Sequence, residues 1–216
     1  MPFKTCSTEA RFTRLWSFPP AWKPKPRITI EERAQKARNN RVISLEQAQT
    51  HSHLERFELG DARFQIFRLD GSDRAELTAL MISCLGSAFS NHTIGFYFTA
   101  DGCQNSYVTV KVAPYEIELS SNLYGPATVG HELLNLNFQV YSNYIHLSRL
   151  GTHPQGAGRG GLALTALYNI ASGLNIRSIN FGVHDHNKAA MRFYFHMDFG
   201  HPTNDRCTEW QVEVHN

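Results

Sequence analysis

The sequence predicts an α/β protein of the α+β kind, with a mixed, mostly antiparallel central sheet, a βαβ unit and flanking helices. Two observations predict this fold class. Between residues 93 and 150, strand-like runs follow one another and are separated by turn-forming clusters, as in an antiparallel meander. Between residues 144 and 184, a strand, a glycine-rich loop, a helix and a second strand are predicted within about 40 residues, which indicates a parallel βαβ unit with a right-handed crossover.

Length and composition limit the class of protein. The 216 residues, 42% of them hydrophobic, suit one sizeable domain with an appendage. No apolar run approaches the ~18–20 residues of a membrane span, and the polar N-terminal residues do not form a signal peptide. The four cysteines are scattered without a CxxC pair, so we expect neither a zinc site nor a dithiol site, and no other metal. We expect a reduced, cytoplasmic protein.

Charge divides the chain into two parts. Residues 1–56 carry 11 Lys and Arg against five Asp and Glu, whereas residues 57–216 carry 10 against 14. Five of the nine prolines lie within residues 1–27, where they favour an extended chain. We therefore expect a basic, Pro-containing N-terminal arm with a helical segment (1–56) and a folded domain (57–216). The arm either has its own partner, folds back on the domain or is a solvated tether.

The first elements of the chain follow from caps and periodicity. Residues 29–50 are predicted to be helical, because Thr29 and Glu32 have the spacing of a capping box, and Asn39 and Asn40 can divide this helix. Residues 63–69 alternate as a first strand does. A DGSD turn then leads into a helix over residues 74–85, whose predicted buried stripe is Leu77, Leu80, Met81 and Cys84.

Five further strands are predicted before the glycine-rich loop, namely Ile94–Ala100, Tyr107–Val112, Glu116–Ser121, His131–Val140 and Tyr144–Leu150. In the last of these strands, Ile145 and Leu147 share one face, whereas strict alternation would place Leu150 on the other face. This mismatch predicts a β-bulge near Ser148–Leu150. Simple termination of the strand is the alternative. The loop is followed by a helix over 160–174, a strand over 176–184, a helix over 187–197 capped by Asp185 or Asn187, and a closing strand over 208–215.

Four glycines lie within six positions between a strand and a helix: Gly156, Gly158, Gly160 and Gly161. Bare amides at a helix N-terminus favour an anion, so we expect a phosphate or diphosphate guest, with an empty flexible turn as the alternative. A P-loop is excluded, because Leu162 and Ala163 replace its Lys and Ser/Thr. A dinucleotide fingerprint matches at Gly156, Gly158 and Gly161 with Asp185 downstream, but only 31 residues follow Asp185, too few for the other strands of that domain.

A third pattern fits the same loop. Gln155, Gly158 and Gly160 form Q-x-x-G-x-G, and a second motif follows in the segment NKAAMRFYFHMDF, through Asn187, Ala190, Tyr194 and Phe199. The two linked motifs resemble the acyl-coenzyme A loop and the second signature of the GNAT superfamily of N-acetyltransferases. Asp198 departs from the pattern, where the family usually has glycine. The resemblance covers residues 144–199 and extends more loosely from about residue 57.

This resemblance implies a GNAT-like acyltransferase domain. Its function would be acyl-CoA-dependent N-acyl transfer, most often of acetyl from acetyl-CoA to a primary amine of a small molecule, peptide or protein by direct attack. Tyr194 would be the general acid, with plain ring packing as the alternative. The implied cofactor-binding residues are Leu150, whose main-chain amide would polarise the thioester, Gln155, Gly156, Ala157, Gly158, Arg159, Gly160, Gly161 and Asn187.

The general base is less defined by the sequence. Residues 137–151 contain no Asp or Glu, which leaves His146, Glu132, the His184–Asp185 pair or a water chain. His146 joins Tyr194 as the candidate catalytic pair, because imidazole is a common base at neutral pH. The alternative function is a non-catalytic acyl-CoA-binding module of the same fold that acts through a partner. We expect acyl-CoA and an amine acceptor as partners, without nucleic acid or membrane, and a homodimer stays open.

Overall fold

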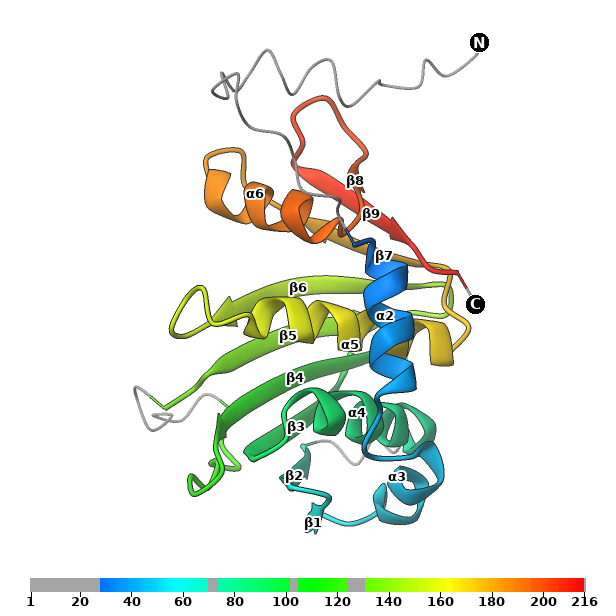
Figure 1. Ribbon diagram of the computed structural model, residues 1–216, viewed down its shortest axis with the longest axis vertical. Helices are drawn as coiled ribbons and strands as arrows, with labels where there is room; N and C mark the ends of the chain where they lie inside the picture. Colours follow the sequence, from blue (N-terminus) through cyan, green and yellow to red (C-terminus); the bar gives the residue numbers. More distant parts are fainter. Residues whose placement is uncertain (1–27, 70–73, 102–104, 124–130, 216) are drawn as a thin grey trace.

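The computed structural model describes residues 28–69, 74–101, 105–123 and 131–215 (Figure 1). A nine-stranded sheet with the order β1-β2-β3-β4-β5-β6-β7-β9-β8 forms its centre. The strands are β1 (Arg56–Leu59), β2 (Ala62–Arg68), β3 (His92–Asp101), β4 (Asn105–Pro114), β5 (Leu134–Val140), β6 (Tyr144–Thr152), β7 (Ser178–Gly182), β8 (His201–Pro202) and β9 (Glu209–Glu213). The helices are α2 (Ile30–Asn39), α3 (Leu45–His51), α4 (Ala75–Ala88), α5 (Arg159–Gly173) and α6 (Lys188–Met197).

The sheet is mixed and mostly antiparallel, as predicted. Two strand pairs are parallel, β2 with β3 and β6 with β7, and each is joined through a helix. The β6-α5-β7 unit was predicted from the sequence, whereas the β2-α4-β3 unit was not. A dinucleotide-binding domain would need a largely parallel sheet, so that interpretation of the glycine loop is wrong. The two-residue and four-residue strands β8 and β1 were also missed, because such short runs have no clear periodicity.

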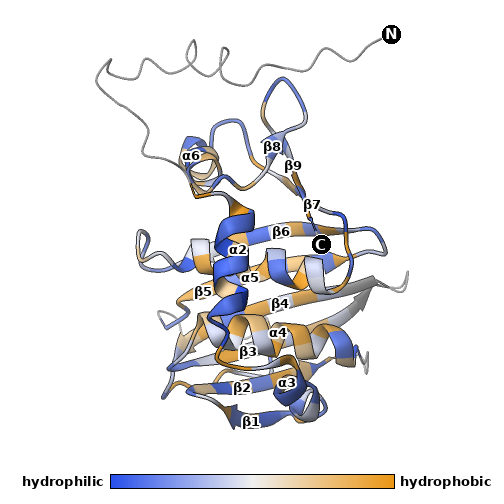
Figure 2. Ribbon diagram, turned by 45° about the vertical axis from the view of Figure 1, so that its right-hand side comes forward, coloured by the Kyte–Doolittle hydropathy of each residue, from blue (hydrophilic) through white to orange (hydrophobic). Residues whose placement is uncertain are grey.

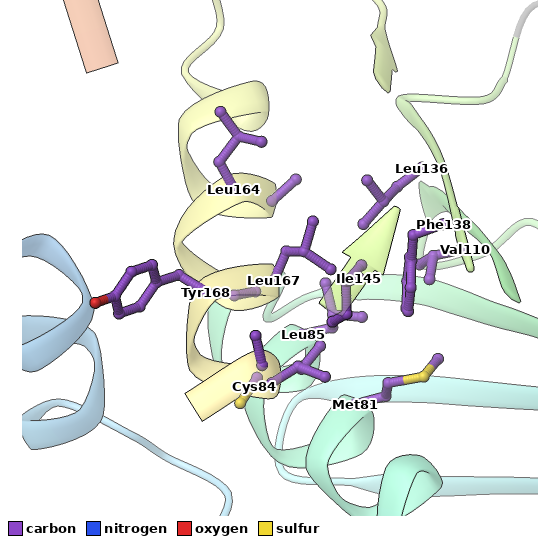
Figure 3. Close-up of a cluster of buried hydrophobic side chains, with 14 of the residues drawn as sticks. Met81, Cys84, Leu85, Val110, Leu136, Phe138, Ile145, Leu164, Leu167 and Tyr168 are labelled. Carbon is purple, nitrogen blue, oxygen red and sulfur yellow. The ribbon is translucent and has the colours of Figure 1, made fainter. Parts of the chain in front are cut away.

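The helices lie on one face of the sheet, where the apolar core sits (Figures 1 and 2). Along β5, burial alternates residue by residue, so Leu134, Leu136 and Phe138 face the helices. Figure 3 shows Leu164 and Leu167 of α5 within this core. The intervening β5 residues Asn135, Asn137 and Gln139 are polar and lie on the opposite face, which we call the open face.

Part of the open face is crossed by residues 115–123. Tyr97 donates its hydroxyl to the Ser120 carbonyl at 2.7 Å, and the Leu119 N–H donates to Gln65 Oε1 at 2.7 Å. The predicted strand Glu116–Ser121 is therefore wrong. This segment leaves the sheet after Pro114, and the contacts above join it to side chains of β2 and β3 rather than to a neighbouring strand.

The segment 30–51 forms two short helices that pack on the sheet domain. Capping boxes at Thr29 and Ser44 begin them, and the chain breaks at Asn40 as predicted. Asn169 of α5 holds α2 in place, because its Nδ2 donates to the Ala34 carbonyl at 3.2 Å. Residues 1–27 and the predicted DGSD turn lie outside the described residues, so the division at residue 56 stays a prediction.

Helix α4 is the most enclosed helix of the core. The four residues of its predicted stripe are buried, and so is every residue from Leu77 to Gly86, because α3, α5 and the sheet surround it. A Cβ added at Gly86 would lie 2.5 Å from Cζ of Phe64, so glycine allows this close approach. Within the described ranges, no helix has both the length and the apolar composition that a bilayer crossing requires.

Candidate active site

The parallel pair β6–β7 separates part-way along its length. Pairing joins Tyr144–Leu147 to Ser178–Phe181 and ends there. β6 continues to Thr152 while remaining paired with β5, and β7 remains paired with β9 to Gly182. Where two strands stop pairing, the backbone N–H and C=O groups on their facing edges have no strand partner. We call the region beside residues 148–152 of β6 the β6–β7 opening.

A β-bulge marks the start of the opening. Phe138 of β5 pairs with Leu147, and the preceding Asn137 pairs with Arg149, so Ser148 is the extra residue. Such a bulge bends a strand and increases its local twist, which turns β6 away from β7 where their pairing stops. The bulge predicted near Ser148–Leu150 is confirmed.

The bulge also sets the environment of Leu150. Because of the extra residue, Leu150 pairs with buried Leu136 and packs against the core. The His153 N–H donates to the Leu133 carbonyl at 3.1 Å and continues the ladder with β5. In an antiparallel ladder, successive residues point their backbone groups to opposite sides, so Gly151 faces β5 and the Leu150 N–H faces the opening. Its role in polarising a thioester stays a prediction.

The glycine loop joins the end of β6 to α5. Gly156 and Gly158 have φ values of 82° and 75°, a left-handed conformation that glycine adopts at low cost. Gly158 is the N-cap of α5 and provides no side-chain cap, so the first-turn amides have no acceptor within the helix. Residues 155–158 are exposed. Exposed amides at a helix N-terminus can bind an anion, and the diphosphate guest of this loop stays a prediction.

Arg159 adds positive charge at the same place. Its Nη1 donates to the His153 carbonyl at 3.4 Å, which links the first turn of α5 to the end of β6. A guanidinium held beside free amides would strengthen binding of a phosphate group.

The remaining glycines of the loop motif bring α6 close to α5. A Cβ at Gly160 would lie 2.9 Å from Cζ of Phe193, and one at Gly161 would lie 2.9 Å from Cε of Met197. The glycines of this motif thus serve two purposes, conformation at 156 and 158 and close helix packing at 160 and 161. As a result, the helix that carries Tyr194 lies against the glycine loop. Sequence reasoning missed this packing role, for which the only signal was the apolar pair four residues apart on α6.

Tyr194 is packed among aromatic rings and is only 8% exposed. Its ring centroid lies 4.5 Å from that of Phe181 and 6.0 Å from that of Trp210. Phe181 is the last β7 residue paired with β6, so Tyr194 sits where the two strands part. Burial raises the pKa of Tyr194 to about 12, which keeps its hydroxyl protonated at neutral pH. The contacts of the ring are those of a packed side chain, and the predicted role of general acid is not tested by them.

His146 lies on the open face, in register with Gln139 on one side and Asn180 on the other. The Tyr194 ring packs on the helix-covered face, so the structure does not bring these two predicted catalytic residues together on one face. A reaction that uses both would have to reach across the opening. The role of His146 therefore stays a prediction.

The other predicted site residues have local partners. Asn187 caps α6, because its Oδ1 accepts the Ala190 N–H at 3.1 Å, and its contact with a cofactor stays a prediction. Glu132 is paired with Lys111 at 2.7 Å. Asp185 lies 3.4 Å from Nδ1 of His186 rather than beside His184. None of these contacts selects a general base.

A separate hollow of about 380 Å³ lies at the opposite end of β6 from the glycine loop. It is lined by the start of α4, the turn between β5 and β6, and Leu174 and Ile176. Arg74 and Glu76 are its charged residues among those described. Because this hollow lies far from the opening and has no group of catalytic side chains, size alone does not make it the candidate site.

Comparisons with known proteins gave matches to structures only. No family model matches the chain, and no curated protein sequence does. Among solved structures, PaiA N-acetyltransferase from Thermoplasma acidophilum, in complex with coenzyme A, aligns at 14% identity and a TM-score of 0.38, over 50% of this chain and 60% of that one. Tetrahymena GCN5 aligns at 11% identity and a TM-score of 0.35, over 50% of this chain and 69% of that one. Nourseothricin acetyltransferase aligns at 14% identity and a TM-score of 0.33, over 55% of this chain and 83% of that one.

Two of these three proteins are named as acetyltransferases. The alignments are partial, and the chain spans less than two thirds of the PaiA enzyme. With TM-scores below 0.5, they add no geometry of their own, so the function proposed below rests on the residues of this chain.

Proposed function

We propose that this protein is an acyl-CoA-dependent N-acyltransferase that transfers acetyl from acetyl-CoA to a primary amine. One observation carries the proposal: the strand opening, the exposed glycine loop and the buried Tyr194 meet at one place. The motif glycines at 160 and 161 create that meeting, because they let α6 pack on the first turn of α5. The loop and the tyrosine come from separate motifs, and neither motif requires this proximity by spacing alone.

Each part suits one requirement of acetyl transfer. The first-turn amides of α5 and the Arg159 guanidinium would hold the diphosphate of the coenzyme. The unpaired edge of β6 would take the amide groups of the pantetheine arm, as a neighbouring strand would. At Leu150, an N–H directed into the opening would stabilise negative charge that develops on the thioester oxygen.

Tyr194 would protonate the departing thiolate. A hydroxyl that stays neutral at neutral pH is available as an acid, and its position beside Phe181 puts it where β6 and β7 part. The acceptor amine would approach from the open face, where no helix of the described residues lies. His146, on that face, is the candidate to take the amine proton directly or through water.

Replacement of Tyr194 by Phe tests this proposal. The variant should bind acetyl-CoA with unchanged affinity in calorimetry, whereas kcat for acetylation across a panel of primary amines should fall about 100-fold or more. Tyr168→Phe is the matched control, because Tyr168 is also buried and its hydroxyl accepts the His215 N–H at 3.0 Å far from the opening. This control should retain kcat.

Two results would contradict the proposal. Full turnover by Tyr194→Phe would remove the tyrosine from the mechanism. Tight binding of acetyl-CoA by the wild-type protein without acetylation of any amine would favour the non-catalytic binding module instead.

A further inference from the structure

We propose that the acceptor is an amine that also carries a carboxylate, as an α-amino acid does, and that Asn137 and Arg149 hold it on the open face. This inference rests on the proposed acetyl transfer and names the substrate class for the same site. It starts from two side chains whose hydrogen-bonding capacity the described residues do not use.

Asn137 presents an acceptor without a donor. Its Oδ1 is buried, and no hydrogen bond reaches it in the described part of the chain. A buried polar oxygen that lacks a donor is costly, and such atoms are uncommon in folded proteins. The side chain as a whole is half-buried, so rotation of the amide group can bring the oxygen to the surface. An amine N–H of a ligand would then supply the missing hydrogen bond.

Arg149 presents a cation without a partner. The residue is exposed, and among the described residues no ion pair or hydrogen bond involves its guanidinium. The guanidinium forms a planar fork of N–H groups that matches a carboxylate in two parallel hydrogen bonds. An anionic group of the ligand is therefore its natural partner.

The two side chains lie side by side on the open face, on neighbouring strands. Asn137 and Arg149 are in register, at the pair where the β-bulge occurs, so their Cα atoms lie about 4.5–5.5 Å apart. The Asn137 oxygen can accept a hydrogen bond from an amine, and the Arg149 guanidinium can donate to a carboxylate. At this separation, the two groups match an amine and a carboxylate on the same carbon atom. The next pair is Leu136 with Leu150, so the bound amine would lie one residue away from the N–H that faces the opening.

Surrounding charges favour an anionic acceptor over a polycation. The described neighbours on the open face, Asn135, Gln139, His146 and Asn180, carry no carboxylate. Lys111 and Glu132 form an ion pair of 2.7 Å and largely neutralise each other. A second ammonium group on the acceptor would meet the Arg149 charge with no free carboxylate beside it among these residues, which makes polyamines poor candidates.

Matched acceptors test the proposal on the full-length protein. The probes are the L-amino acids, their C-terminal amides and the corresponding decarboxylated amines, so that each set differs only in the carboxylate. Acetyl-CoA consumption should give a kcat/KM for the preferred amino acids that exceeds that of their amides by about tenfold or more. A thermal-shift series with CoA present reports acceptor binding without turnover and should show the same order.

Variants then assign the two groups. Arg149→Gln should reduce the preference for the carboxylate to about one, and Arg149→Glu should reverse it towards amides and amines. Arg177→Gln is the matched control, because Arg177 is an exposed arginine at the far end of the β6–β7 pair, and it should keep the wild-type preference. Asn137→Leu should raise the acceptor KM about three- to tenfold while the melting temperature stays the same or rises, because an unsatisfied buried group has been removed.

The outcomes separate this inference from the proposed function. Acetylation of amides and simple amines as rapidly as amino acids, or an unchanged preference in Arg149→Gln, would overturn the inference and leave acetyl transfer intact. A fall in stability of Asn137→Leu with an unchanged acceptor KM would remove Asn137 from the site. Absence of acetylation of every amine, despite acetyl-CoA binding, would overturn both.

Discussion

Among the described residues, the sheet contains two parallel strand pairs, and one of them opens. β2 pairs with β3 over six consecutive residues, and beyond the last pair the Leu69 N–H still donates to the Phe98 carbonyl at 3.0 Å. β6 pairs with β7 over four residues and then separates. In both units, the connecting helix packs on the same face of the sheet (Figure 1). The same supersecondary unit therefore builds closed core in one half of the sheet and the candidate site in the other.

Aromatic packing accompanies the closed pair. On the open face, Phe67 of β2 stacks on Tyr97 of β3 with centroids 4.6 Å apart, and on the helix-covered face Phe64 lies 6.1 Å from Phe96. The ladder is regular, without a bulge. In the open pair, a single extra residue, Ser148, interrupts the ladder with β5 where pairing with β7 ends. The bulge, rather than the βαβ topology, therefore distinguishes the candidate site from the closed core.

Deletion of Ser148 should have the largest effect, because it would make the open pair resemble the closed one. Without the extra residue, Arg149 and Leu150 keep their partners on β5, and alternation from Leu147 becomes regular. We expect an unchanged or higher melting temperature together with a loss of acetyl-CoA affinity of at least about 100-fold, measured by calorimetry. Retention of affinity in a folded deletion variant would show that the bulge does not create the site.

Gly158→Ala should have an intermediate effect. A Cβ there meets no atom within 4 Å, but the φ of 75° is strained for alanine, so we expect a loss of about 1–2 kcal/mol of unfolding free energy. Acetyl-CoA affinity should fall about tenfold, because the methyl group would occupy the approach to the first-turn amides.

Gly60→Ala is the matched control for this variant. Gly60 has a φ of 59° and lies beside Ile43, far from the opening. Chemical denaturation should show a similar loss of stability, whereas calorimetry should show wild-type affinity for acetyl-CoA. Equal losses of affinity in the two variants would mean that backbone strain alone, rather than the place of Gly158, explains the effect.

Loss of the Tyr194 hydroxyl should have the smallest effect on ligand affinity, and its effect is on how stability depends on pH. Because burial raises the pKa of Tyr194 to about 12, the folded protein favours the neutral phenol relative to the unfolded chain, whose tyrosines titrate near 10. This contribution to stability is fully present below pH 10 and is lost as the pH rises through 12. It amounts to about 2–3 kcal/mol.

Unfolding measured between pH 9 and 12 in wild-type protein and in Tyr194→Phe would isolate this contribution. The wild-type protein should lose stability more steeply, while both proteins keep the same acetyl-CoA affinity at neutral pH. Parallel pH profiles would mean that the Tyr194 hydroxyl is better solvated than its 8% exposure indicates.

The sequence predicted those parts of the site that depend on local geometry. The glycine cluster predicted a turn with bare amides at the start of α5, and the mismatch between Leu147 and Leu150 predicted the bulge. The cap of α6 was narrowed to two residues, of which Asn187 is used. These signals are readable because each of them depends on residues close together in the chain.

What the sequence could not predict depends on which strands and helices become neighbours. The closed unit β2-α4-β3 was missed because the sequence of a strand does not indicate which other strand pairs with it in parallel. The segment 116–121 has strand-like composition, but its backbone N–H at Leu119 bonds to the Gln65 side chain instead. The contact of Gly160 with Phe193, and the pairing of Asn137 with Arg149, likewise arise only in the folded sheet.

A crystal structure with bound acetyl-CoA would show where the coenzyme lies. We expect the diphosphate at the first-turn amides of α5 and the pantetheine arm along residues 148–152 of β6, within the opening. A structure in which β7 pairs with this stretch of β6 and closes the opening, or in which the coenzyme binds elsewhere on the protein, would contradict this expectation.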